Sequence, residues 1–334
     1  MSIHFTDTDP TRRARASAGP LGLAALTALR APSLFNTQPW RWDLHDDVAD
    51  LRADLDRQLV ATDPDSRLLI VSCGTALHHA LVALAAAGHT VEVRRLPDPS
   101  QPTLLARLVL TGRRAPTPMD LRLVQAIAVR RSDRRPFTAI PVPGESVEAL
   151  RDAAERHGAH LQFLRDEQVV ELTVAGQHAS DAEFTDPAYR AELGAWTHRP
   201  PHAADGVPAD AAVATVPRRV VVRDFAPAGD AALPPGTGTD AGTRYGLLFT
   251  DTDAPADWLA AGEAMSAVLL AAVCAGLAAS PMSDITEVPA VREDLRRRIL
   301  AGLGWPVLAL RFGTVERPGT VPRSPRRDPG QEPS

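Results

Sequence analysis

Residues 32–40 read Pro32-Ser33-Leu34-Phe35-Asn36-Thr37-Gln38-Pro39-Trp40, and this stretch decides how the rest of the chain is interpreted. Its prolines restrict the backbone, while Asn36 and Gln38 each carry both a hydrogen-bond donor and an acceptor. A loop of this kind can bind the edge of a polar ring system. It can equally be a polar turn between a helix and a strand. We expect Trp40 to anchor the loop in the core.

A second polar stretch, Arg130-Arg131-Ser132-Asp133-Arg134-Arg135-Pro136-Phe137, lies near the middle of the chain, after a helix predicted over Met119 to Arg131. Guanidinium groups so close together can bind a phosphate through bidentate, charge-assisted hydrogen bonds. The contrary interpretation is a surface ion-pair cluster around Asp133, which adds little stability. The residues alone leave both interpretations open.

Length and composition limit the class of protein. A chain of 334 residues favours about two domains, and 44% apolar residues suffice for a sizeable core. A net charge of −5 favours neither nucleic acid nor a membrane surface as partner. All 36 basic residues are arginine, which excludes a Walker-type phosphate loop, a lysine Schiff base and a Ser-Lys dyad.

Cysteine usage and the first residues predict a cytoplasmic protein. Cys73 and Cys274 are isolated among apolar or small residues, as expected for buried free thiols in a reducing compartment. Met1 to Ala18 is polar and Arg-bearing, unlike a secretory leader. The uncharged run Ala264 to Ser280 is predicted to be a buried core helix rather than a membrane span. The histidine spacings predict no metal site.

The pattern along the chain predicts two similar halves, divided near residue 115. Helices are expected over Leu21 to Arg30, from Asp65 or Ser66 to Ala87, and over Asp257 to Ala279. Arg199 to Gly242 is rich in Pro, Gly, Ala and Asp, with only Arg219 to Arg223 resembling a strand. An irregular segment of this length is typical of a functional lid or a mobile insertion.

The two polar stretches together resemble the nitroreductase superfamily, most closely the actinobacterial Acg-type proteins. In ordinary nitroreductases the two motifs occur in the opposite order, and the flavin lies between two subunits that each contribute one motif. Here each half keeps only one motif, which implies two subunits fused into a pseudo-dimer with one flavin site. The further matching pieces are Asp65-x-Arg67, Ser72-Cys73-Gly74, Leu193-x-x-Trp196, Asp205-Gly206-Val207-Pro208, Gly276-Leu277-Ala278-Ala279-Ser280-Pro281 and Glu287-Val288-Pro289.

The resemblance implies an α+β nitroreductase-like fold. With the division near residue 115, the N-terminal half is expected at 1–115 and the C-terminal half at 116–334, and the irregular segment is expected to be a lid at 199–242. It implies FMN as the cofactor, with flavin N5 rather than a catalytic side chain carrying the chemistry. Arg134 is implied to place a positive charge near flavin N1 and O2. The residues implied to bind FMN are Ser33, Asn36, Gln38, Arg130, Arg131, Ser132, Arg134, Pro281, Met282, Ser283, Arg326 and Arg327, with a disordered tail as the alternative for the last two.

Two functions follow from the resemblance. The first is an oxidoreductase that takes a hydride from NADH or NADPH and passes it to a nitroaromatic, a quinone or a similar small acceptor. The second is an FMN-binding or storage protein, with residues 199–242 blocking the site so that little or no turnover occurs. A third, oxygen-dependent destruction of the flavin, has no residue that favours it. In each case the fused halves favour a monomer. The net charge favours neither nucleic acid nor a membrane as a partner.

Overall fold

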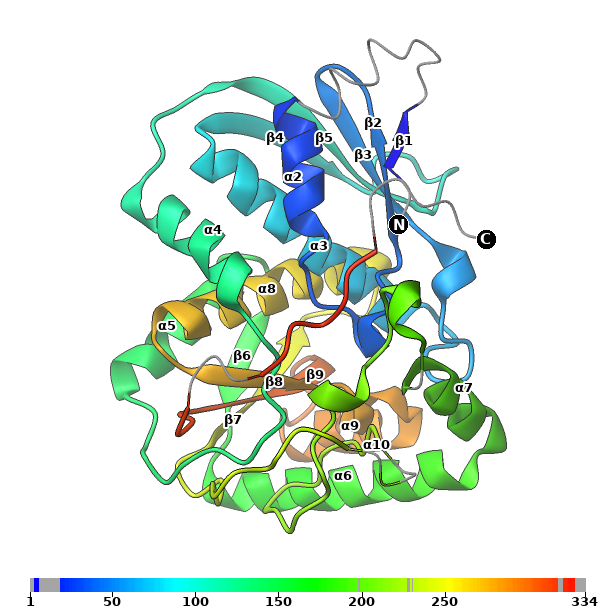
Figure 1. The fold of residues 1–334 in the computed structure, drawn as a ribbon, viewed down its shortest axis with the longest axis vertical. Coiled ribbons are helices and arrows are strands. Elements are labelled where there is room, and N and C mark those ends of the chain that lie inside the picture. Colours follow the sequence, from blue (N-terminus) through cyan, green and yellow to red (C-terminus); the bar gives the residue numbers. More distant parts are fainter. Residues whose placement is uncertain are drawn as a thin grey trace.

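Two β-sheets lie on either side of a central pair of helices, α3 (Arg67–Ala86) and α8 (Pro255–Cys274), in the computed structural model (Figure 1). The structure describes residues 3–5, 19–197, 199–226, 229, 231–317 and 321–327. The first sheet has the order β1-β2-β3-β5-β4, and the second has the order β6-β7-β9-β8. The chain therefore has an α+β fold with one sheet in each half.

The first sheet is antiparallel except at its edge, where β1 pairs with β2 in parallel. Its strands are β1 (Ile3–Phe5), β2 (Trp40–Leu44), β3 (Val48–Ala53), β4 (His89–Arg95) and β5 (Leu104–Arg113). In β2 the buried residues alternate with half-buried ones, as expected for a strand with one face on a core. The expected core role of Trp40 is confirmed, because its side chain is fully buried.

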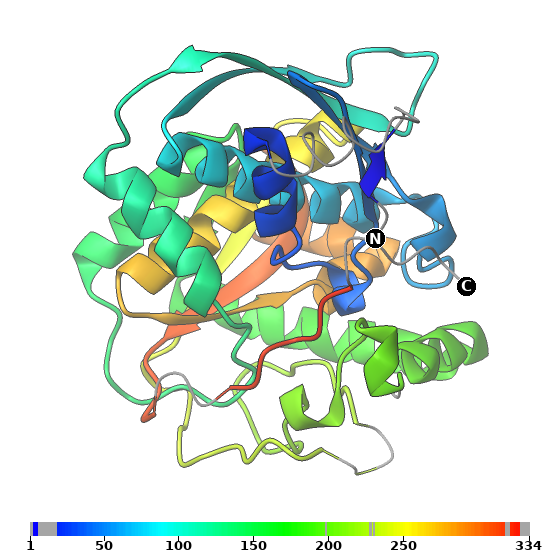
Figure 2. The same cartoon turned by 45° about the horizontal axis from the view of Figure 1, so that its top comes forward.

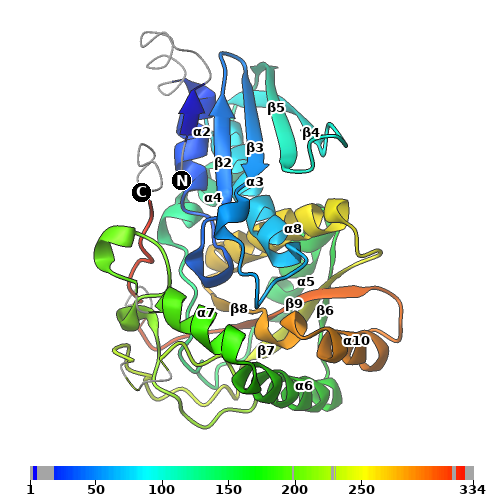
Figure 3. The same ribbon diagram turned by 90° about the vertical axis from the view of Figure 1, so that its right-hand side faces the viewer.

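The second sheet is antiparallel throughout. Its strands are β6 (His160–Phe163), β7 (Arg244–Thr250), β8 (Ala278–Met282) and β9 (Trp305–Gly313). One face packs against α5 (Gly144–Glu155) and α8, and the other against α6 (Asp166–Thr185) and α10 (Pro289–Arg298) (Figure 3). The remaining helices are α2 (Pro20–Ala28), α4 (Pro118–Val129), α7 (Pro187–Thr197) and α9 (Asp284–Glu287).

The central helices belong to both cores at once. Leu68 and Val71 of α3 pack into the core of the second half, while Leu259 of α8 packs into the core of the first. The two backbones approach most closely at Gly74 and Gly262, where a Cβ built on either glycine would lie 2.8 Å from the Cα of the other. Since only hydrogen fits there, the two glycines set the distance between the halves.

Helix ends depart from the sequence expectation in two places. The first turn of α3 is capped by Asp63, whose carboxylate accepts from the backbone N–H groups of Leu68 and Leu69 at 3.0 and 2.8 Å. Neither Asp65 nor Ser66 has that role. Helix α8 ends at Cys274, before the predicted Ala279, because Gly276 has a φ of 72° and stops the helix. The residues that follow form β8.

The predicted strand Arg219 to Arg223 is wrong: residues 219–223 are in no strand. This stretch runs beside α6, where Thr173 Oγ1 donates to the carbonyl of Arg219 at 2.8 Å and Gly176 lies against Val221. Among the described residues, no neighbouring strand offers this stretch a hydrogen-bonding edge. A composition rich in β-branched residues is therefore not enough to make it a strand.

Both long central helices are apolar enough to cross a membrane, and 78% and 67% of the relevant stretches of α3 and α8 are buried inside the protein. That burial is typical of core helices. Both cysteines are free; Cys73 is buried as expected, whereas Cys274 is exposed because it ends α8 at the surface.

Replacing Gly262 with alanine is expected to destabilise the protein by about 1–3 kcal/mol, because the new Cβ would lie 2.1 Å from the Val71 carbonyl oxygen. Gly194→Ala in α7 is the matched control, since its Cβ would meet nothing within 4 Å. That change is expected to stabilise the protein by about 0.5–1 kcal/mol. Urea unfolding of both variants measures the difference, and equal stability would contradict the role given to the helix contact.

Candidate functional site

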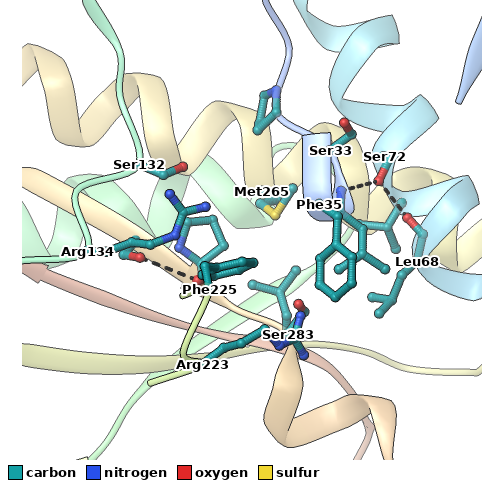
Figure 4. A pocket seen from close by; sticks show the side chains of 16 residues that line it. Ser33, Phe35, Leu68, Ser72, Ser132, Arg134, Arg223, Phe225, Met265 and Ser283 are labelled. Carbon is teal, nitrogen blue, oxygen red and sulfur yellow. Dashed lines mark hydrogen bonds between the residues drawn. The ribbon is translucent and has the colours of Figure 1, made fainter. Parts of the chain in front are cut away.

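A cleft of about 610 Å3, partly open to solvent, lies where the two halves meet (Figure 4). The loop after α2 and the first turns of α3 form one wall. The opposite wall is formed by the basic motif, which lies between α4 and α5, and by α8, β8 and β9. Residues of the irregular segment close the cleft. The lining residues are Pro32, Ser33, Leu34, Phe35, Leu68, Val71, Ser72, Ser132, Arg134, Arg223, Phe225, Met265, Ser280, Pro281, Ser283 and Leu308.

The loop after α2 holds an unusual backbone conformation at the cleft. Phe35, Asn36 and Gln38 have φ values of 47°, 57° and 52°, in the left-handed region that residues other than glycine rarely adopt. Ser33 Oγ accepts from the backbone N–H of Gln38 at 2.9 Å, and Ser72 Oγ accepts from that of Leu34 at 3.1 Å. These bonds fix the loop against α3 and turn Phe35 toward the cleft.

Asn36 and Gln38 line neither the cleft nor any other described pocket; they join three segments of the chain. Asn36 Nδ2 donates to the carbonyls of Gly206 and Pro325, each at 3.1 Å, and its Oδ1 accepts from Arg326 at 2.8 Å. Gln38 Nε2 donates to the carbonyl of Ala204 at 3.0 Å. The two amides therefore hold the irregular segment and the C-terminal tail against the loop.

Different residues of the basic motif fit the two interpretations that the sequence left open. Asp133 pairs with Arg135 at 2.7 Å, as the ion-pair interpretation expects, although Asp133 is buried rather than at the surface. Arg130 and Arg134 are different, because no ion pair joins either of them to a carboxylate among the described residues. Arg134 lies 4.4 Å from the ring centroid of Phe225 and extends along the cleft (Figure 4).

A second pocket of about 980 Å3 lies at the ends of α2 and α4 and beside the tail, and we call it the arginine pocket. Its lining residues are Leu26, Leu29, Arg30, Ile127, Ala128, Arg130, Arg131, Arg323, Ser324, Arg326 and Arg327. The tail, residues 321–327, runs back from the second half to reach α2 (Figures 1 and 2). Arg130 Nη1 donates to Ser132 Oγ at 3.4 Å, which connects the arginine pocket to the cleft.

The arginine pocket holds positive charge that its own residues do not neutralise. None of its lining residues is acidic, and Arg130 Nε, Arg326 Nε and Arg327 Nη1 are buried without a hydrogen-bond partner among the described residues. Burial and neighbouring arginines lower the pKa of Arg130 to about 10 and that of Arg326 to about 9. Buried donors without acceptors are costly, so an anion fits here.

Comparison with known proteins identifies the family. Rv3131 of Mycobacterium tuberculosis, named as an NAD(P)H nitroreductase, is 36% identical over 334 residues, covering 99% of this chain and 93% of that protein. The acg protein of the same organism, which bears the same kind of name, is 35% identical over 309 residues, covering 90% and 92%. The chain belongs to the Acg-type nitroreductases. No protein-family model matches it.

Solved structures of nitroreductases are also similar to this one. NfnB from Mycobacterium smegmatis, solved in complex with NADPH, is 16% identical, covers 63% of this chain and 96% of its own, and gives a TM-score of 0.40. A Bacteroides fragilis nitroreductase with bound FMN is 13% identical, covers 64% and 97%, and gives a TM-score of 0.39.

In this nitroreductase the predicted site residues divide among four locations, one of which is the contact of Asn36 and Gln38 with the irregular segment and the tail. Ser33, Ser132, Arg134, Pro281 and Ser283 line the cleft, whereas Arg130, Arg131, Arg326 and Arg327 line the arginine pocket. Met282 is buried in the core beside α6, whereas Pro281 and Ser283 on either side of it line the cleft.

Among the lining residues that the sequence prediction missed, four carry a charge or an aromatic ring and lie outside both motifs. Arg223 and Phe225 line the cleft, and Arg30 and Arg323 line the arginine pocket. None lies within a recognisable motif. The only available signal was the clustering of arginine near the end of the chain and around residue 223.

Arg223 is held in the cleft by buried acids behind it. It pairs with Glu287 and, at 3.3 Å, with Glu183, and its guanidinium lies 4.8 Å from the ring centroid of Phe35. Burial, with the charges of Glu287 and Asp284, raises the pKa of Glu183 to about 8, although Arg223 opposes this shift. Tyr189 also faces the group, and burial raises the pKa of its hydroxyl. Three acids around one arginine thus retain a proton near neutral pH.

No group of three or more His, Cys, Asp or Glu side chains suited to a metal ion occurs in the part of the chain that the structure describes. His78 and His79 both contact Ser266 Oγ through their Nδ1 atoms, at 2.8 and 2.9 Å, and are buried between the central helices. His198 lies outside the described residues.

The proton on Glu183 gives a testable pH dependence. A glutamate in the unfolded chain ionises near its ordinary value of 4.5, whereas Glu183 in the folded protein keeps its proton up to about 8. The folded state therefore binds more protons in this window, and the free energy of unfolding falls as the pH rises through it. Glu183→Gln should flatten this fall in urea unfolding, while Glu167→Gln, an exposed change on the same helix, should not.

Proposed function

We propose that this chain binds one FMN, with the flavin ring in the cleft and the phosphate in the arginine pocket. The buried, unpartnered donors of Arg130, Arg326 and Arg327 carry this proposal, because a phosphate would supply the acceptors they lack. Ser132 lies in the cleft and contacts Arg130, so it is placed to bind the ribityl chain that connects ring and phosphate. The motifs shared with the nitroreductases imply the same cofactor.

The two walls of the cleft divide the task of binding. Ser33 and Phe35 approach from the first half, and Pro281 and Ser283 from the second. Asn36 and Gln38 contribute through the loop conformation and the tail rather than by direct contact, in the conformation that the structure describes. Arg134 supplies a positive charge along the cleft, which stabilises negative charge on a bound ring. Arg131 completes the phosphate contacts.

The proposed activity is that of an oxidoreductase, with NADH or NADPH as hydride donor and a nitroaromatic, a quinone or a similar small molecule as acceptor. The names of the relatives that cover nearly all of this chain support it. When bound, FMN supplies hydride transfer at N5. The chain orients the ring, places Arg134 beside it and limits access of water, so no side-chain acid or base is assigned.

A second candidate, FMN binding with little turnover, is favoured by the position of Phe225 and Arg223. Both belong to the segment 199–242, and both extend into the cleft, where Phe225 lies edge-on to Phe35 at 5.8 Å between ring centroids (Figure 4). Buried Asp240 accepts from Arg311 at 3.2 Å and so fastens the end of this segment. We propose that the segment is a lid that competes with the nicotinamide or the acceptor.

The proposal extends to the organisation of the protein. The first half is assigned to residues 1–115 and the second to 116–334, and the fused halves are expected to act as a monomer in the cytoplasm. The net charge of −5 and the burial of the two long apolar helices support a protein without nucleic-acid or membrane partners.

The deciding experiment mixes the FMN-loaded protein with NADH or NADPH in the absence of oxygen and follows flavin absorbance. Rapid bleaching supports the enzyme, and a flavin that only dithionite reduces supports storage. A colourless protein that binds no added FMN contradicts both.

Arg134→Ala should weaken FMN binding by at least about tenfold, since a charge-assisted contact contributes about 1.5–3 kcal/mol. Arg113→Ala, at the exposed end of β5, is the control and should leave the affinity unchanged. Fluorescence titration of the flavin-free protein measures both, and equal losses would count against the assigned ring site.

Phe225→Ala should accelerate reduction of the bound flavin by NADPH if the lid competes for the cleft, because it removes the lid's aromatic ring from that space. Phe184→Ala, an exposed change on α6, is the control. Stopped-flow reduction rates compare them, and an unchanged rate in Phe225→Ala would remove the lid from the explanation.

A further inference from the structure

The arginine pocket carries more positive charge than one phosphate neutralises. Six arginines line it, and no ion pair to a carboxylate holds any of them within the described residues. A phosphate monoester carries about 1.5–2 negative charges at neutral pH. Loading the pocket with the phosphate of FMN would therefore leave most of its positive charge without a counterion.

The six arginines are arranged from the interior outward. Arg130 and Arg327 are buried, and Arg326 is anchored by Asn36 and by the carbonyls of Arg30 and Ala31. Arg130 is the member that contacts Ser132 and so faces the cleft. These three carry the unpartnered buried donors, which makes the inner end the place for the flavin phosphate.

Arg30 and Arg323 form the outer end, where both side chains are exposed. Their charges reach Arg131, another residue that lines the pocket, because the pKa of Arg131 is lowered by its burial and by the charges of Arg323 and Arg30. An ordinary surface arginine pairs with a carboxylate or extends into solvent away from other cations. These two converge on a pocket that already contains four.

We propose that the outer end of the arginine pocket binds a second phosphoryl group, beside the phosphate of the flavin. This inference rests on the proposed FMN site and deepens it. The second group is either the outer phosphate of a flavin dinucleotide or the phosphate of a separate molecule. The two sources share one chemistry, an anionic phosphoryl group held by Arg30 and Arg323, with Arg131 shared between it and the flavin phosphate. This group carries about one negative charge in a dinucleotide and nearly two in a separate monoester, and experiment distinguishes the two sources.

The test uses the full-length protein freed of flavin, at fixed ionic strength, in three forms. These are the wild type, the outer-end variant Arg30→Gln with Arg323→Gln, and a control with the same loss of charge, Arg113→Gln with Arg244→Gln. Arg113 and Arg244 are exposed and lie outside the described pockets. Each form is titrated with FMN and with FAD by flavin fluorescence, and the FMN-loaded forms are titrated with inorganic phosphate and pyrophosphate by calorimetry.

If the second group belongs to a dinucleotide, the wild type and the control bind FAD at least tenfold more tightly than FMN. The outer-end variant loses this preference while its FMN affinity changes less than about threefold, since solvent screens the remaining long-range attraction. If it belongs to a separate molecule, FAD shows no advantage. FMN-loaded wild type then binds one phosphate or pyrophosphate, and only the outer-end variant fails to.

Two results would overturn the proposal. In one, the wild type prefers neither FAD nor any added anion; in the other, the control loses as much as the outer-end variant. A protein that binds neither flavin would instead contradict the proposed function. In that case, pyrophosphate titration of the flavin-free protein still tests the second phosphoryl site. Binding that is lost only in the outer-end variant supports the site, and the absence of binding in the wild type rejects it.

Discussion

The fold depends on the contact between α3 and α8, in which Gly74 and Gly262 let two buried helices approach backbone to backbone. Each helix also contributes side chains to the core of the opposite half. Because a closely packed interior transmits small displacements, the spacing of the helices fixes the relation of the two sheets. The cleft lies beside this contact, with Val71 on one wall and Met265 on the other, so its width follows from the same constraint.

A second constraint is electrostatic and concerns the tail. Arg326 would be an unpaired charge in the interior, but Asn36 and two backbone carbonyls after α2 hold it in place. Its position completes a pocket built from three distant parts of the chain. Stability alone does not favour so many unneutralised arginines, because burial and the neighbouring arginines lower the pKa of Arg130 and of Arg326. Binding of an anion gives the arrangement a physical reason.

Local sequence patterns predicted the positions of the long helices well, and failed where the partner was remote. The end of α8 was misplaced by five residues, from Cys274 to Ala279, since an apolar run continues past Gly276 into β8. Arg219–Arg223 has strand-like composition but meets a helix. Asn36 and Gln38 are predicted to bind FMN, and in this structure their amides donate to the carbonyls of Gly206, Ala204 and Pro325, contacts that no local pattern predicts.

The sequence by itself determined the family, the α+β class, the absence of lysine chemistry and the division of two motifs between two halves. These follow from residue identity and local order, which a single chain displays directly. Only the tertiary structure decided that Arg130 and Arg134 have no ion pair with an acid among the described residues, while Asp133 and Arg135 pair with each other. Only the tertiary structure placed Arg223 and Phe225 in the cleft. These residues lie 91 or more positions from Ser132 along the chain, so packing rather than sequence order brings them to the same site.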